Sequence, residues 1–148
     1  MKKLLGAAMV SVVLLLGGCS LEGSNVKLGE EFIGEVNTLE GALLTVEEVN
    51  DSATGITYVI DNQSEKDLNY GQDYGLQKEK EGKWYPVEPK DPVAITLELL
   101  WIPAGNTDTH EISWEASYGK LPKGHYRIVK SLADDTQGYY LAGEFTVQ

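Results

Sequence analysis

The 148-residue chain contains a single cysteine and few basic residues. One cysteine excludes an internal disulfide and a cysteine-rich metal site, since each needs at least two thiol groups. Lys and Arg number 12 against 23 Asp and Glu, which gives a formal net charge of −11. Because such a surface is repelled by nucleic acids and by anionic lipid head groups, we expect no DNA or RNA partner.

Recognisable catalytic motifs are also missing. His110-Glu111 begins like the H-E-x-x-H zinc motif, but Trp114 occupies the place of the second histidine. Asp108, His110 and Ser113 are close in sequence, but neighbours along a strand alternate between faces and do not converge on one substrate. No G-x-S-x-G elbow is present. We therefore expect no catalytic residue, no metal ligand and no cofactor.

Acidic side chains in the expected loops leave one alternative open. Glu47-Glu48 and Asp134-Asp135, together with Asp51, could bind Ca²⁺, which prefers carboxylate oxygens. The chain has no D-x-D-x-D-G loop, which favours solvated loop carboxylates instead.

The one long apolar run lies at the N-terminus. Lys2 and Lys3 precede an apolar stretch, residues 4–16, that is shorter than the roughly 20 residues that span a bilayer. Leu16-Gly17-Gly18-Cys19 follows and resembles the lipobox of bacterial lipoproteins. The resemblance implies a signal peptide over residues 1–18 and a lipid on Cys19, which would hold the protein on the extracytoplasmic face of the cell membrane. The alternative is an ordinary secretory signal with an incidental cysteine.

The segment after this signal is expected to be a lipidated tether over residues 19–40, partly extended. It is rich in Gly and Glu, but Phe32, Ile33 and Val36 leave open the pairing of part of it as an edge strand. Loss of residues 1–18 removes two basic and no acidic residues, so the mature chain would be still more acidic. The lipid, and no basic patch, is therefore expected to hold the protein at the membrane.

Residues 41–148 show short β-type runs separated by turn residues and no long helical periodicity. This pattern predicts an all-β domain, an antiparallel β-sandwich of about seven strands, which the family resemblance described below implies to be immunoglobulin-like. The apolar stretch 93–101 fits either a helical turn or a strand. The other expected strands cover residues 43–49, 55–62, 68–70, 74–80, 83–87, 109–114, 126–132 and 140–147.

A Leu-Pro-Lys-Gly turn, residues 121–124, leads into the strand that begins near Tyr126. This is the place of the tyrosine corner of β-sandwiches, in which the phenol bonds back to the preceding turn. Lys130 is in phase with the apolar residues of this strand, and we interpret it as the point where the strand leaves the core. The expected core comprises Val46, Ile56, Tyr58, Ile60, Leu76, Ile112, Trp114, Tyr126, Ile128, Leu141 and Phe145.

Four segments occur in an order that resembles the bacterial immunoglobulin-like domain of lipid-anchored proteins in Gram-positive bacteria. They are GITYVIDNQS, YGQDYGLQKEKEGKWYPV, PAG and YGKLPKGHYRIVK, and the resemblance covers about residues 43–147. It implies a non-enzymatic module and transfers no catalytic residue.

Aromatic residues are too numerous to face one core, and Tyr and Trp are enriched where proteins bind partners. We select Trp101, Tyr85 and Trp84 as candidate ligand-binding residues; the alternative is that these side chains cap the open ends of the sandwich. The expected function is binding of an envelope protein or cell-wall component outside the membrane. The alternative function is modulation or inhibition of an extracytoplasmic enzyme such as a protease.

Overall fold

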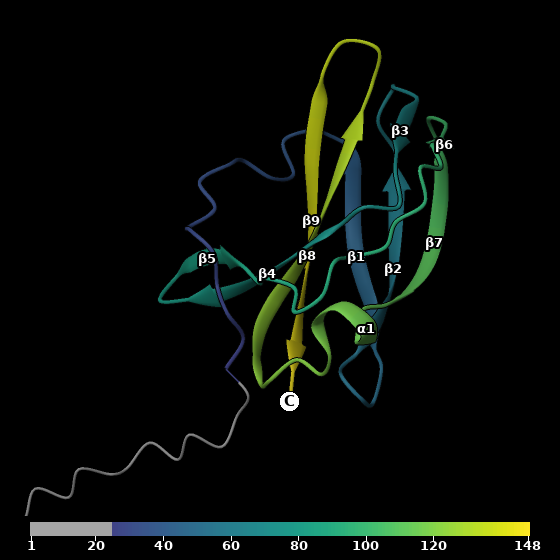
Figure 1. Ribbon diagram of the computed structural model, residues 1–148. Coiled ribbons are helices and arrows are strands. Elements are labelled where there is room, and N and C mark those ends of the chain that lie inside the picture. Colours follow the sequence, from purple (N-terminus) through teal and green to yellow (C-terminus); the bar gives the residue numbers. More distant parts are fainter. Residues whose placement is uncertain (1–24) are drawn as a thin grey trace, which may run out of the picture.

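Two antiparallel sheets pack face to face in the computed structural model, which describes residues 25–148 (Figure 1). The fold is therefore the all-β sandwich predicted from the sequence, with nine strands in the described residues instead of about seven. The elements are β1 (Ala42–Val49), β2 (Gly55–Asn62), β3 (Leu68–Tyr70), β4 (Gly75–Lys80), β5 (Lys83–Pro86), β6 (Leu100–Ile102), β7 (Asn106–Ser113), α1 (Glu115–Tyr118), β8 (Gly124–Ala133) and β9 (Gly138–Val147).

The smaller sheet has the strand order β1-β2-β7, with β2 in the centre. Ile56, Tyr58 and Ile60 alternate along β2 and are buried against the second sheet. The residues between them, such as Thr57, lie on the outer face. The period-2 pattern of the sequence is what fixes this orientation, because successive side chains of a strand point to opposite faces.

The larger sheet has six strands built around β8. β9 pairs with β8 along its whole length, while β3 and β4 follow one another along the other edge of β8. β5 then pairs with β4, and β6 pairs with β3. The outer border of this sheet therefore has two halves, one formed by β5 and the other by β6.

Lys130 fills the break between β3 and β4. Its Nζ donates hydrogen bonds to the carbonyl oxygens of Gly71 at 2.7 Å and Asp73 at 2.6 Å, and the residue is only 1% exposed. The interpretation that the strand leaves the core at Lys130 is wrong, because β8 continues to Ala133. A buried ammonium is tolerated here because it binds carbonyls that the interrupted ladder leaves free.

The core contains the expected residues, of which only Val46 and Ile112 are half-buried instead of buried. Phe145 stacks between Trp114 and Tyr126, with ring centroids 5.8 Å and 5.7 Å away. Sequence reasoning missed buried residues in short or irregular segments, Leu68, Ile102 and Leu121, and also Leu132 near the end of β8.

The stretch 93–101 forms neither of the two expected structures over most of its length. Only its last residues belong to a strand, β6, and residues 92–99 have no regular structure. The single helical turn α1, which follows β7, was not predicted because four residues are too few to show a helical period.

Residues 25–41 lie against the larger sheet. The backbone N–H of Gly29 donates to Pro86 O and that of Phe32 to Trp84 O, each at 2.8 Å, so this segment covers the free edge of β5 (Figure 1). The side chain of Asn37 then pairs with the backbone N–H and C=O of Ala142 in β9. The part of the expected tether within residues 25–40 thus packs on the domain.

The expected signal peptide and Cys19 lie outside the described residues. Within residues 25–148, no helix is long and apolar enough to cross a bilayer.

Candidate functional site

Trp84, one of the three candidate ligand-binding residues, lies on the outer face of β5 and is half-buried. The Arg127 guanidinium lies 4.4 Å from the Trp84 ring centroid and 5.4 Å from that of Phe32. Arg127 is buried, and its Nε donates a hydrogen bond to Gln77 Oε1 at 2.7 Å. Trp84 therefore binds another part of its own chain, since the stacked Arg127 joins it to Phe32 of the N-terminal segment.

Tyr85 follows Trp84 in β5 and so points to the opposite face of the strand. It pairs with Lys78 of β4, whose Nζ lies 5.5 Å from the ring centroid of the buried Tyr126. Tyr85 is half-buried at the border of the core.

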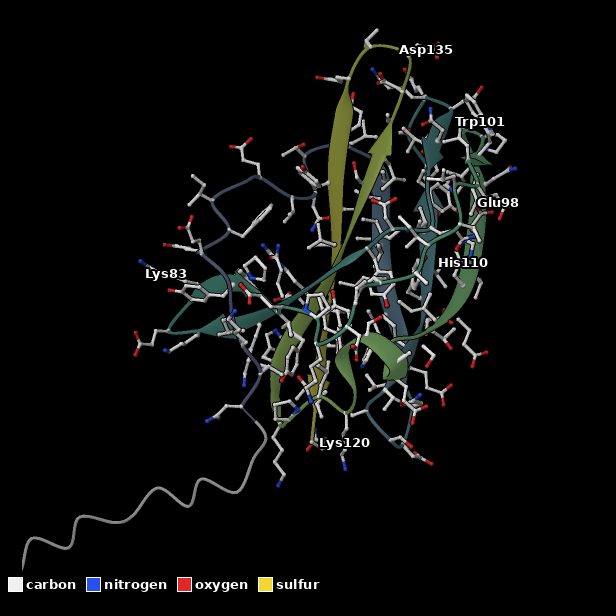
Figure 2. The ribbon with its side chains drawn as sticks, in the orientation of Figure 1. Lys83, Glu98, Trp101, His110, Lys120 and Asp135 are labelled. Atoms are coloured by element: carbon white, nitrogen blue, oxygen red, sulfur yellow. The ribbon has the colours of Figure 1, made fainter. Side chains whose placement is uncertain are left out.

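Trp101 lies far from both residues, on β6, and is 57% exposed. Its position in β6 is opposite Asn69 of β3, on the outer face of the larger sheet. Figure 2 shows Trp101 on the opposite side of the molecule from Lys83 of β5. The structure thus brings Trp84 and Tyr85 onto one strand but does not bring Trp101 to them, and the three residues do not form one surface.

Trp101 instead continues a second exposed feature, which we name the apolar edge segment, residues 93–101. Ile95, Leu97 and Leu99 are 47%, 99% and 56% exposed. No backbone–backbone hydrogen bond joins residues 92–99 to any other part of the described chain. The sequence signal for this surface was visible as apolar residues at every second position, but the pattern alone did not show that they face water.

A polar cluster lies between β3, the strand that pairs with β6, and β7 of the other sheet. The Tyr70 hydroxyl lies 2.6 Å from Asp108 Oδ2 and 2.6 Å from His110 Nε2 (Figure 2 labels His110). Since the one phenol proton goes to Asp108, His110 Nε2 donates its hydrogen to the Tyr70 oxygen. This arrangement joins β3 of one sheet to β7 of the other.

The protonation of the cluster follows from its burial. Burial, followed by the bond to Asp108, raises the pKa of Tyr70 well above its ordinary value. Burial lowers the pKa of His110, an effect that Asp108 opposes and Lys130 reinforces. Tyr70 is therefore a neutral phenol whose hydrogen-bonding capacity is used within the fold, and it is not poised as a nucleophile.

A Ser-His-Asp interpretation of β7 has no geometric support. Asp108 and His110 share one face of the strand and bind Tyr70, whereas Ser113 lies on the other face with its hydroxyl 3.4 Å from Thr54 O. Trp114, in the fifth position of the motif that starts at His110, is buried and its Nε1 donates to Ala53 O. In residues 25–148, no three His, Cys, Asp or Glu side chains come together as metal ligands.

Asp134 is the acidic loop residue with the most extensive hydrogen bonding. Its carboxylate accepts bonds from Lys66 Nζ and the Tyr139 hydroxyl at 2.8 Å, and from the backbone N–H groups of Thr136 and Gln137. These donors, Lys66 first, hold the pKa of Asp134 far below its ordinary value. The carboxylate closes the β8–β9 turn, so its oxygens are engaged by hydrogen-bond donors.

Tyr126 begins the inward face of β8, directly after the Leu-Pro-Lys-Gly turn. Its hydroxyl donates a hydrogen bond to Pro122 O at 2.7 Å, and its ring is fully buried. Burial raises the pKa of this phenol to about 12. The bond has the geometry of a tyrosine corner, in which strand and preceding turn are joined four residues apart.

Comparison with protein families gives one match, to a model described as "Bacterial Ig-like domain", over residues 25–146. The match covers both sheets and includes the N-terminal segment from its first described residue. Comparisons with curated proteins and with solved structures gave no significant match.

Proposed function

Because the chain belongs to the family of bacterial Ig-like domains, we propose that it is a non-enzymatic interaction module held by a lipid on the outer face of a bacterial cell membrane. The family match over residues 25–146 is the observation that carries the interaction module, and the lipid anchor rests on the resemblance of residues 16–19 to a lipobox. Ig-like sandwiches serve widely as recognition modules, although a fold by itself names no ligand.

The chemistry of the described residues supports a binding role over a catalytic one. The polar cluster around Tyr70 uses its hydrogen-bonding groups within the fold, and no nucleophile lies beside a general base there. The exposed apolar edge segment offers surface area for a partner instead.

The anchor is tested by fractionation of cells that express the full chain. The expected result is that the wild-type chain stays with the membranes and that Cys19→Ser releases it, because the only thiol that could carry a lipid is lost. Ser20→Ala, next to the cysteine, is the control and is expected to stay membrane-bound. A Cys19→Ser chain that fractionates like wild type would contradict the lipid anchor.

The binding role is tested by crosslinking on intact cells, followed by identification of the attached envelope component. The expected result is a small, reproducible set of extracytoplasmic partners that is absent when the chain is not expressed. Crosslinking only to itself and to abundant bystander proteins would count against a binding module.

Modulation of an extracytoplasmic enzyme stays an alternative prediction. It requires that the purified chain change the rate of an envelope protease, which a peptidase assay with and without the chain measures directly.

A further inference from the structure

The apolar edge segment has apolar residues at five successive alternate positions, Val93, Ile95, Leu97, Leu99 and Trp101. In an extended chain these side chains lie on one side, since alternate residues of a strand share a face. The last four are all at least 47% exposed. Contiguous apolar side chains are rarely left in water on a monomer, so this row of residues marks an interaction surface.

The backbone of the same segment is available for pairing. β6 pairs with β3 on one side, and no other strand of the described residues pairs with β6. The backbone of residues 92–99 makes no backbone–backbone bond within the described chain. A free edge of this kind is a template for an added strand.

The other half of the same border shows what such an addition looks like. At β5 the N-terminal segment supplies backbone donors, with Gly29 bonding to Pro86 O and Phe32 to Trp84 O. Phe32 also packs at 5.9 Å against Tyr140 of β9, so the added segment brings both backbone bonds and an aromatic anchor. β6 has no such cover within residues 25–148.

The acidic charge of the chain indicates the chemistry of the partner. The net charge is −11, and residues 91–119, a range that extends from the edge segment and β6 to β7 and α1, contain five Asp or Glu and no Lys or Arg. Glu98 lies within the segment itself, on the same side of the molecule as Trp101 (Figure 2). Two copies of this acidic edge would repel one another, whereas a basic segment would be attracted.

We propose that β6 and residues 93–99 bind an extended segment of a partner protein, in which basic side chains alternate with apolar ones, by adding it as a strand. This deepens the proposed function and rests on it, because it assigns the surface and the partner chemistry of the binding module. The backbone bonds give the partner its extended form, the apolar row receives alternate side chains, and the acidic surroundings select basic ones.

The probe for this proposal is a capped peptide of about nine residues, matching positions 93–101, in which Lys and Val alternate. The full chain is purified in non-ionic detergent and titrated with this peptide and with a Glu-Val peptide of equal length. We expect the Lys-Val peptide to bind with a Kd below about 1 mM and at least about tenfold more tightly than the Glu-Val peptide. Hydrogen exchange is expected to slow at residues 93–102 on binding, because new backbone bonds protect the amides.

Two variants and a modified peptide separate strand addition from unspecific attraction. Leu99→Lys is expected to weaken binding of the Lys-Val peptide by about tenfold or more. Leu43→Lys is the matched control, because Leu43 is 54% exposed against 56% for Leu99 and lies on β1 of the other sheet; binding is expected to change less than twofold. Methylation of alternate peptide nitrogens removes backbone donors and is expected to abolish binding.

Several results would overturn the proposal: no binding of the Lys-Val peptide below about 1 mM, equal binding of the methylated or the Glu-Val peptide, or equal loss in the two variants. Reversible dimerisation that Leu99→Lys abolishes would assign the edge to a second copy instead. If cells still crosslink an envelope partner through Leu99→Lys as through wild type, only this inference fails. If no partner exists for either chain, the proposed function itself fails.

Discussion

β5 and β6 form two halves of the same sheet border and are treated differently by the fold. The edge of β5 is covered by residues of the N-terminal segment, and its outward Trp84 is packed over the buried Arg127. The edge of β6 has no cover in the described chain, and its outward Trp101 is 57% exposed. The two tryptophans looked equivalent in sequence, but one serves the fold and the other faces solvent.

The comparison shows that, within residues 25–148, the chain covers one free edge with its own N-terminal segment and leaves the other edge without a pairing segment. A long, uncovered, apolar edge is a hazard for aggregation, which proteins usually avoid by charges, prolines or a covering segment. Here Pro92 and Pro103 bracket the apolar edge segment, and Glu98 places a negative charge within it. These features limit the hazard without covering the backbone.

Among the polar and stacking contacts, the largest effect is expected from removing Arg127, which supports the covered half. Arg127→Ala is expected to lower the free energy of unfolding by about 3 kcal/mol, because it removes the stacking on Phe32 and Trp84 and leaves Gln77 buried without its donor. Urea denaturation measures the loss, and hydrogen exchange at Gly29 and Phe32 should accelerate. Lys123→Ala, an exposed neighbour, is the control and should stay within about 0.5 kcal/mol.

The next largest effect is expected at the polar cluster of Tyr70, Asp108 and His110, which joins β3 to β7. Tyr70→Phe is expected to cost about 2 kcal/mol, since one hydroxyl serves both Asp108 and His110 in a partly buried site. Thermal and urea denaturation of the variant measure this. An unchanged midpoint would show that water replaces the phenol without loss, and that β3 and β7 are held together by apolar packing alone.

Tyr126→Phe provides the corresponding test near the covered half. We expect a cost of about 1–2 kcal/mol, because Pro122 O loses the only hydrogen bond that the phenol makes. The effect should be smaller than that of Tyr70→Phe, since one partner is lost instead of two. A midpoint equal to wild type would mean that the corner bond adds nothing to stability.

Lys130, which lies between β3 and β4 where the two halves meet, should make the stability of the fold depend on pH. Burial lowers the pKa of Lys130 to about 8 from 10.5, with Asp73 opposing the shift. Between these values the unfolded chain binds more protons at this lysine than the folded one, so stability should rise with pH from about 8 to 9, by less than about 1.4 kcal/mol per unit. Above about pH 9 the opposite effect grows, because the fold raises the pKa values of Tyr58, Tyr74 and Tyr126 to about 12 and the unfolded chain releases these phenol protons first.

The matched variant for this slope is Lys130→Met, which removes the titrating group and keeps the length of the side chain. Urea midpoints of the variant should not rise between pH 8 and 9. A slope of the same size in both proteins would assign the pH dependence to other groups.

The smallest effect on stability is expected at the uncovered edge. Leu99→Lys should change the free energy of unfolding by less than about 0.5 kcal/mol, because the side chain is already in water. Ile102→Ala, three residues away in β6 and fully buried, should cost about 2–5 kcal/mol. Equal losses in the two variants would show that the apolar edge segment belongs to the core of the fold.

The sequence predicted the β-sandwich well because alternation is a local property. In β2 the alternate residues Ile56, Tyr58 and Ile60 are apolar and buried, and in β8 Tyr126 and Ile128 follow the same rule. Lys130 violated the rule, since its carbonyl partners at residues 71 and 73 lie in the distant loop between β3 and β4. The signal peptide and the lipid on Cys19 remain predictions of the N-terminal pattern.

The candidate surface could be predicted only in part. Trp101, Tyr85 and Trp84 were selected together because aromatic residues are too numerous for one core; the structure shows Trp101 exposed, whereas Trp84 and Tyr85 are half-buried on another strand. The row from Ile95 to Leu99 was visible as an apolar stretch and was assigned to a helical turn or a strand. Exposure depends on what other segments cover, which one local pattern does not contain.

By itself, the sequence determined the strand pattern, the acidic charge and the turn before Tyr126, because each depends on residues close together in the chain. Only the tertiary structure decided which half of the sheet border is covered and which aromatic residues serve the fold. Those outcomes depend on contacts between distant segments, such as Phe32 with Arg127 and Tyr70 with Asp108 and His110. Burial and pairing are properties of the assembled sheet, and no single strand encodes them.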